Sequence, residues 1–299
     1  MSAPSGLVVV DKPAGLTSHD VVGRLRRLLG TRKIGHAGTL DPMATGVLVL
    51  GVQRATRLLG HLALDTKAYA ATIRLGVTTS TDDAEGEVTA TADAGGVDEA
   101  RVRAGIAALT GPIEQVPSAV SAIKVNGKRA YQRVREGEQV ELAARPVTVS
   151  AFELDALRRD GACTELDVRV ECSSGTYIRA LARDLGAGLG VGGHLTALRR
   201  TRVGPFGLDT ARTLDELAEH PELTHSLETA VAAAFRVRVA DAEEAAALSF
   251  GRPLTAVGIA GVYAVTDSTG RALALVSEVD DRAKPVLVLA PADGSSAPA

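Results

Sequence analysis

An aspartate in a glycine-rich loop is the first candidate for chemistry in this sequence. Asp41 lies in G-H-A-G-T-L-D-P-M-A-T-G at 35–46, directly before Pro42, which favours an extended backbone at Asp41. Gly35, Gly38 and Gly46 would let the backbone approach a ligand closely. A carboxylate presented this way can act as a nucleophile or stabilise a developing cation. Asp-Pro is also common turn chemistry, so the residues alone leave a simple turn open.

The sequence argues against several common kinds of catalytic and cofactor-binding site. The sequence lacks the P-loop, H-E-x-x-H and G-x-S-x-G motifs. GAGLGVGG at 186–193 follows a predicted helix rather than a strand, so it reads as a helix end and turn instead of a dinucleotide loop. The six histidines show no metal-ligand spacing, and two cysteines make neither a zinc site nor a disulfide framework. We therefore expect no cofactor and no metal.

The elements that would position Asp41 alternate irregularly. We expect strands at 6–10, 47–52, 68–76, 146–155, 163–172 and 195–203, and helices at 18–29, 98–109 and 177–189, the last capped by Thr176. Asn126-Gly127 predicts a hairpin. Short helices near 213–220 and 226–235 precede a β-rich tail with a helix at 241–249. This order predicts an α+β fold, with a domain boundary near 236 and a disordered C-terminal end.

Composition and charge limit the partners. The 299 residues include 45% hydrophobic residues, and no apolar run suits a membrane span or a signal peptide, so we expect a cytoplasmic protein. Residues 1–204 carry a net charge of +4 and residues 205–299 a net charge of −7. Basic residues without acids gather at 21–40 and 116–135, and Arg199, Arg200 and Arg202 form a third cluster. These clusters could neutralise phosphates, although the helix face with Arg24 and Arg27 could equally be solvated surface.

Six long motifs, in order over about residues 6–205, closely resemble the TruB-type tRNA pseudouridine synthases. They are DKPAGLTSHDVV (11–22), KIGHAGTLDPMATGVLVLGVQRAT (33–56), AYAATIRLGVTTSTDDAEG (68–86), PSAVSAIKVNGKRAY (117–131), CSSGTYIRALARDLG (172–186) and GGHLTALRRTRVG (192–204). The resemblance implies a pseudouridine synthase core around an extended mixed or antiparallel sheet. Residues 1–235 would form this catalytic domain, with a thumb insertion at about 116–146. Residues 236–299 resemble a small PUA-like RNA-binding domain.

The resemblance also implies an activity and a site. The enzyme would isomerise uridine 55 in the T arm of tRNA, flipping the base out of its stack. Asp41 would be the catalytic carboxylate, Arg179 its partner, and Tyr69 the ring that stacks on the target base. The substrate-binding residues would be Lys12, His36, Lys124, Lys128, Arg129 and Leu198. From the residues alone, Arg179 could be a surface arginine, Tyr69 a half-buried strand aromatic and Leu198 core packing.

Two rival functions follow from the same residues. A non-catalytic RNA-binding protein or chaperone could use the same fold, but the intact set of Asp41, Tyr69 and Arg179 favours catalysis. A Ser/His/Asp hydrolase is disfavoured because no serine lies on a nucleophile elbow. No sustained heptad or interface stripe is visible, so we expect a monomer that binds tRNA and neither a membrane nor a nucleotide cofactor.

Overall fold

The structure is a computed structural model, which describes residues 4–63, 66–118, 124–125, 128–129 and 142–292. Most of the expected thumb lies outside these residues, and so does the C-terminal end expected to be disordered. For Lys124, Lys128 and Arg129, only the backbone is described. Their backbones form two short paired strands, β8 (Lys124–Val125) and β9 (Lys128–Arg129), on either side of 126–127. The pairing confirms the hairpin predicted there.

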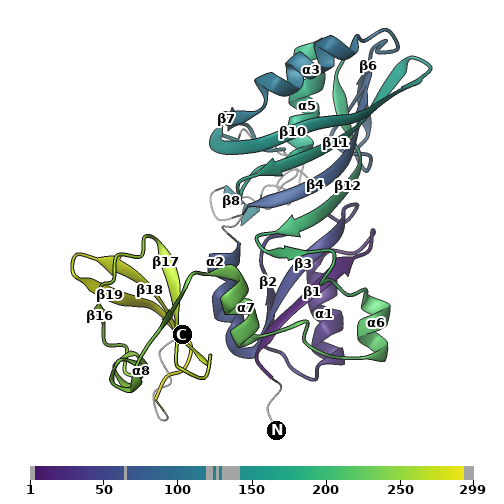
Figure 1. The fold of residues 1–299 in the computed structure, drawn as a ribbon. Coiled ribbons are helices and arrows are strands. Elements are labelled where there is room, and N and C mark those ends of the chain that lie inside the picture. Colours follow the sequence, from purple (N-terminus) through teal and green to yellow (C-terminus); the bar gives the residue numbers. More distant parts are fainter. Residues whose placement is uncertain (1–3, 64–65, 119–123, 126–127, 130–141, 293–299) are drawn as a thin grey trace.

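One ten-stranded mixed sheet forms the main body of the molecule (Figure 1). Its path is β14 (His225–Ser226), β1 (Gly6–Lys12), β3 (Thr45–Val52), β12 (Gly193–Val203), β4 (Lys67–Leu75), β11 (Cys163–Cys172), β10 (Arg145–Asp160) and β7 (Gly111–Gln115), with β2 (Ile34–His36) beside β3 and β13 (Phe206–Gly207) beside β12. All neighbours are antiparallel except β3 and β12, which are parallel. The α+β fold expected from the sequence is confirmed.

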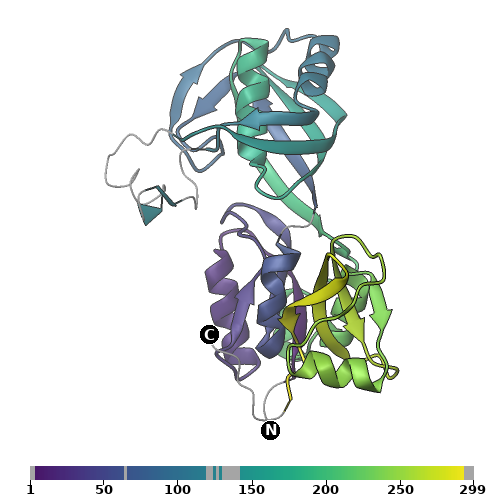
Figure 2. The same ribbon diagram turned by 90° about the vertical axis from the view of Figure 1, so that its left-hand side faces the viewer.

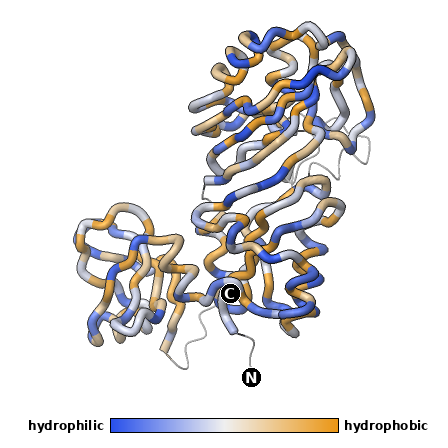
Figure 3. The backbone as a smooth tube through the Cα atoms, turned by 45° about the vertical axis from the view of Figure 1, so that its right-hand side comes forward, coloured by the Kyte–Doolittle hydropathy of each residue, from blue (hydrophilic) through white to orange (hydrophobic). Residues whose placement is uncertain are grey.

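The main sheet divides into two halves that meet at β12 (Figures 1 and 2). The first half holds β1, β2 and β3, with the helices α1 (Ser18–Leu28), η1 (Gln53–Leu58), α2 (Leu59–Leu62), α6 (Leu214–Glu219) and α7 (Leu227–Ala234). The second half holds β4, β7, β10 and β11, with α3 (Glu99–Ala108), α5 (Ile178–Leu189) and the short pair β5 (Val77–Thr79) and β6 (Val88–Thr91). Each half has its own buried hydrophobic clusters, and Figure 3 shows hydrophobic stretches in both.

Two helices position the residues that matter below. Helix α1 begins with a capping box, in which Thr17 and Asp20 exchange hydrogen bonds, and it buries Val21, Val22 and Leu25. Helix α5 buries a wide apolar face and ends at Gly190, in the left-handed conformation with φ 78°. The expected cap at Thr176 is wrong. Tyr177 is the first flanking residue, with no side-chain cap, because the Thr176 hydroxyl donates instead to the Ser173 carbonyl.

A second sheet occupies the C-terminal part of the chain. Its order is β15 (Val237–Val239), β17 (Val262–Thr266), β18 (Ala272–Val279), β19 (Arg282–Val288) and β16 (Leu254–Thr255), with helix α8 (Ala242–Ser249). One face packs into the same hydrophobic cluster as Leu58, Leu62 and Val231 of the first half, through Leu275 and Leu287 among others. The β-rich tail expected from the sequence is therefore in contact with the main body through a shared apolar core.

Candidate active site

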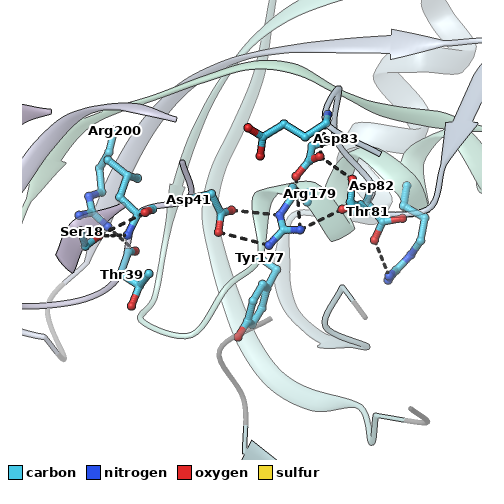
Figure 4. A network of polar contacts seen from close by, with 12 residues as sticks. Ser18, Thr39, Asp41, Thr81, Asp82, Asp83, Tyr177, Arg179 and Arg200 are labelled. Carbon is cyan, nitrogen blue, oxygen red and sulfur yellow. Dashed lines mark hydrogen bonds and ion pairs between the residues drawn. The ribbon is translucent and has the colours of Figure 1, made fainter. Parts of the chain in front are cut away.

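The loop that carries Asp41 connects β2 to β3 in the first half of the main sheet. The Asp41 carbonyl accepts a hydrogen bond from the Ala44 amide at 3.1 Å, so the Asp-Pro turn weighed from the sequence is present. The Asp41 side chain is 34% exposed and points away from this turn toward helix α5 (Figure 4). The residue is therefore both a turn residue and a carboxylate accessible to a ligand.

A buried arginine from the other half of the sheet meets this carboxylate. Arg179 lies in the first turn of α5, and its side chain is only 5% exposed. Its Nε lies 3.0 Å from Asp41 Oδ2, and its Nη2 donates to Asp41 Oδ1 at 3.3 Å. This two-point contact orients the carboxylate as a single hydrogen bond could not. The structure brings together the two residues that the sequence analysis paired.

A second carboxylate, with no role assigned from the sequence, completes this network. Asp83 is 4% exposed and its Oδ2 lies 3.4 Å from Arg179 Nη1. The same Nη1 donates to the Thr81 carbonyl at 2.9 Å. Asp83 Oδ1 accepts hydrogen bonds from the Thr81 hydroxyl and the Glu85 amide, at 2.5 and 3.1 Å. The guanidinium is thus fixed on the side opposite Asp41, and Asp83 balances its buried charge.

The neighbouring Asp82 serves a different arginine. Its Oδ2 lies 3.2 Å from Nη1 of Arg183, one turn further along α5, and Arg183 Nη2 donates to the Val116 carbonyl at 2.7 Å. Gln115 also ties the end of β7 to α5. Its side-chain amide donates to the Tyr177 carbonyl at 3.1 Å and accepts from the Tyr177 amide at 2.8 Å. The entrance to the expected thumb is thereby fastened to the helix that carries Arg179.

Lys12 lies beneath the Asp41 loop rather than on an open substrate surface. It is fully buried, and its Nζ donates to the carbonyls of Pro13, Leu16 and Pro42 at 2.9, 2.7 and 3.2 Å. Burial is the main reason why the Lys12 pKa falls to about 8, and the nearby charge of Arg200 lowers it further while Asp41 opposes the shift. In this structure Lys12 holds the carbonyl of Pro42, the residue after Asp41, so the predicted direct contact with substrate stays a prediction.

Tyr69 and Leu198 both belong to the hydrophobic cluster that reaches the Asp41 loop. They are 8% and 7% exposed and share this cluster with Leu40 and Ala44. Burial raises the pKa of the Tyr69 phenol, and the charge of Arg200 partly opposes this rise. The core-packing alternative is therefore present for both residues. A base-stacking role for Tyr69 stays a prediction, because the structure holds no RNA.

His36 lies in β2, just before the Asp41 loop, and is half-buried. Its ring packs edge-on against His19 of α1, with ring centroids 5.5 Å apart. This places it at the start of the same loop, beside α1. The predicted role in extruding the target nucleotide is untested.

The third basic cluster expected from the sequence is excluded as a phosphate-binding surface only at Arg200, which is buried, because Arg199 and Arg202 keep 40% and 35% of their side chains exposed beside carboxylate partners. Arg199 makes a two-point ion pair with Asp11, with Nη2 2.6 Å from Oδ2, and Arg202 lies 3.1 Å from Glu171. Arg200 is 1% exposed. By contrast, Arg24, Arg27, Arg32 and Lys33 are exposed, so the segment 21–40 remains a candidate for phosphate contacts.

Within the described part of the chain, no group of three or more His, Cys, Asp or Glu residues is arranged to hold a metal ion. The same residues include no helix long and apolar enough to cross a membrane. The Asp41–Arg179–Asp83 network is therefore the constellation with the clearest chemistry.

Comparison with family models supports the resemblance. Residues 26–178 match the TruB family pseudouridylate synthase (N terminal domain), and residues 179–246 match the tRNA pseudouridylate synthase B C-terminal domain. Residues 235–290 match the model described as tRNA Pseudouridine synthase II, C terminal. The three matches follow one another along nearly the whole chain.

Individual proteins agree. The chain is 67% identical to tRNA pseudouridine synthase B of Nocardia farcinica, over 96% of this chain and 94% of that protein. It is 62% identical to the protein of the same name from Rhodococcus jostii, over 96% and 95%. A solved Cbf5-Nop10-Gar1 complex contains a chain with a TM-score of 0.74 and 26% identity, covering 96% of this chain and 85% of that one. The chain belongs to the TruB family of pseudouridine synthases.

Proposed function

We propose that this TruB-family enzyme converts uridine 55 in the T arm of tRNA to pseudouridine, with Asp41 as the catalytic carboxylate. The relatives named tRNA pseudouridine synthase B support tRNA as the substrate. One observation supports the assignment of the site. A buried arginine contacts Asp41 at two points, yet about a third of the Asp41 side chain remains exposed to solvent. The carboxylate is therefore oriented and still reachable.

The reaction breaks the N1–C1′ bond of uridine, turns the detached uracil over, and joins C5 to C1′, after which C5 loses its proton and N1 gains one. Cationic character develops at the sugar, and a fixed carboxylate can attack or stabilise that carbon. Asp41 supplies this carboxylate. Arg179 holds it in one orientation, so little reorganisation is needed when the charge at C1′ develops.

The remaining residues would confine the base. In this proposal Tyr69 stacks on the target uracil, with Leu198 packing beneath it in the cluster that reaches Leu40. His36 takes part in extruding the nucleotide, because chemistry on a stacked base requires flipping. Lys124, Lys128 and Arg129 of the thumb contact phosphates of the T arm. The chain acts as a monomer in the cytoplasm, and residues 236–299 form a domain that contacts the tRNA away from uridine 55.

The proposal is tested with unmodified tRNA transcript and a carbodiimide (CMC) that labels pseudouridine, read out by primer extension. Wild-type protein should produce a stop that reports modification of uridine 55, one nucleotide to its 3′ side, and of no other uridine. Asp41→Asn should abolish the stop and leave tRNA binding largely intact, because phosphate contacts lie elsewhere. Asp155→Asn, in an exposed ion pair with Arg169, is the matched control and should retain activity. Turnover by Asp41→Asn would refute the catalytic assignment, and a stop elsewhere would refute the position.

A further inference from the structure

The candidate site is assembled across a narrow join between the two halves of the main sheet. Asp41 belongs to the half with β1 and β3, whereas Arg179 and Asp83 belong to the half with β4 and α5. Strand β12 pairs with β4 along Gly193–Val203, but with β3 at only two positions, Arg199 with Thr45 and Arg200 with Gly46. The Asp41–Arg179 contact therefore depends on a join with few backbone hydrogen bonds.

Arg200 spans this join. Its backbone lies opposite Tyr69 on one side of β12 and opposite Gly46 on the other. Its guanidinium crosses toward the Asp41 loop. There Nε donates to the Val47 carbonyl at 2.7 Å, and Nη1 and Nη2 donate to the Thr39 and Gly38 carbonyls at 3.2 and 3.4 Å. Figure 4 shows Arg200 with Thr39 and Ser18 on one side of Asp41, and Arg179 on the other.

The two hydrogen bonds from Nη1 and Nη2 fix the loop on the side that precedes Asp41, and the one from Nε holds the start of β3 that follows it. Ser18 adds to them, because its hydroxyl accepts from the Leu40 amide at 2.9 Å and donates to the Leu40 carbonyl at 3.2 Å. Lys12 holds the Pro42 carbonyl on the following side. The residues on both sides of Asp41 are thus held by buried side chains, and among the side chains named here only Arg200 belongs to the strand that joins the halves.

Stability alone does not explain this arrangement. Arg200 is 1% exposed, and its hydrogen-bond acceptors given above are neutral carbonyls rather than a carboxylate. Burying an arginine is costly, and a well-packed apolar side chain is often at least as stabilising. Its burial also keeps phosphates away from it. What the guanidinium provides is geometry, since its planar fork reaches carbonyls on both sides of the loop at once.

We propose that Arg200 is a positioning residue for the isomerisation. Its hydrogen bonds hold the Asp41 loop in a fixed position relative to β12, and thereby keep the Asp41 carboxylate in contact with Arg179. The inference rests on the proposed function, because the effect is measured on pseudouridine formation.

The test compares Arg200→Lys and Arg200→Met with wild-type protein under single-turnover conditions, beside tRNA affinity from filter binding. Lysine keeps the charge but loses the fork. We expect both variants to slow the reaction by about 10- to 100-fold, the range for a misplacement on the ångström scale, while the tRNA Kd changes less than about twofold. Arg74→Met on β4, in an exposed ion pair with Asp160, is the control and should react at the wild-type rate.

A double-mutant cycle separates positioning from general destabilisation. If Arg200 acts through the Asp41–Arg179 contact, Arg200→Lys should cost little further rate in an Arg179→Lys background. The proposal would be overturned if the rate losses of the two single variants multiplied in the double variant. It would also be overturned if each Arg200 variant reacted within twofold of the wild-type rate. So would a circular dichroism spectrum showing that neither Arg200 variant folds, because Arg200 would then be a folding residue. Failure of wild-type protein to form pseudouridine would instead refute the proposed function.

Discussion

Replacing Asp83 by asparagine tests whether the second carboxylate of the network matters. The substitution keeps the size of the side chain and removes its charge. Asp83 is 4% exposed and Arg179 is 5% exposed, so water can do little to replace the lost contact. Arg179 would keep its hydrogen bond to the Thr81 carbonyl and its two contacts with Asp41. The guanidinium would remain bound but would lose the anion that fixes its far side.

The size of the effect follows from that contact. A hydrogen bond to a charged group contributes about 1.5–3 kcal/mol. If Asp83→Asn costs the transition state this amount, the rate falls by about 10- to 150-fold, since each 1.36 kcal/mol is tenfold. Because Asp83 is buried behind Arg179, tRNA affinity should change less than about twofold, the pattern of an interaction that acts only in the transition state.

The assay is single-turnover pseudouridine formation on a tRNA transcript, with the tRNA Kd measured in parallel. Asp82→Asn is the matched control. Asp82 is the adjacent residue, and its ion pair is with Arg183 instead of Arg179. Its φ of 60° is a conformation that asparagine tolerates well, so the backbone should not change. Equal rates for Asp83→Asn and Asp82→Asn would refute the idea that Asp83 fixes Arg179 for catalysis.

Three further predictions follow. The Lys12 pKa lies near 8 in the folded protein, below the ordinary 10.5, so the unfolded chain binds more protons between these values. Across this window the free energy of unfolding of the wild-type protein should therefore rise with pH relative to that of Lys12→Met. The rate of pseudouridine formation should fall above about pH 8, because Lys12 then loses the proton that helps it hold the loop. Neutralising Lys124, Lys128 and Arg129 together should weaken tRNA binding and reduce the slope of log K against log salt by about one for each lost phosphate contact. An unchanged slope would show that these thumb residues do not contact the tRNA phosphates. Removing residues 236–299 should lower the melting temperature, because Leu58, Leu62 and Val231 lose apolar cover, and an unchanged temperature would show that the shared cluster contributes nothing.

Local elements were largely predictable from the sequence, because their signals are local. Apolar periodicity predicted helix α1 and strands β3, β4 and β11 to within a few residues. The fold class also followed from the order of these elements. What periodicity could not supply is the order of strands in the sheet, since β3 and β4, which pair with β12 on its two sides, come from positions more than a hundred residues away.

The site divides in the same way. Asp41 and Arg179 are 138 residues apart, and only the resemblance to a family paired them in advance. Asp83 lies inside a motif that was recognised, T-T-S-T-D-D-A-E-G, but the sequence gives no means of telling it from Asp82. The two adjacent carboxylates point to different arginines because of the local backbone, with Asp82 at φ 60°.

Charge counting misjudged Arg200 for a related reason. Arg199, Arg200 and Arg202 form a dense basic run in the sequence, yet two are paired with carboxylates from distant strands and one is buried. A net charge reports how many cations a segment contains and not which remain available. Arg24 and Arg27 of 21–40 differ because helix α1 carries them on its solvent side.

The glycines of the Asp41 loop show how a correct local signal can have an unforeseen meaning. They indicated that another group approaches the backbone closely, and we expected that group to be a ligand. At Gly46 the group is the backbone of Arg200. With φ at 99°, a Cβ added there would lie 2.1 Å from the Arg200 carbonyl oxygen. Only glycine lets β3 and β12 meet at this point. Gly46 thus allows β12 to lie close to β3, and Arg200 of β12 then donates hydrogen bonds to the Asp41 loop. A local sequence pattern cannot reveal this arrangement, because Arg200 follows Gly46 by more than a hundred residues.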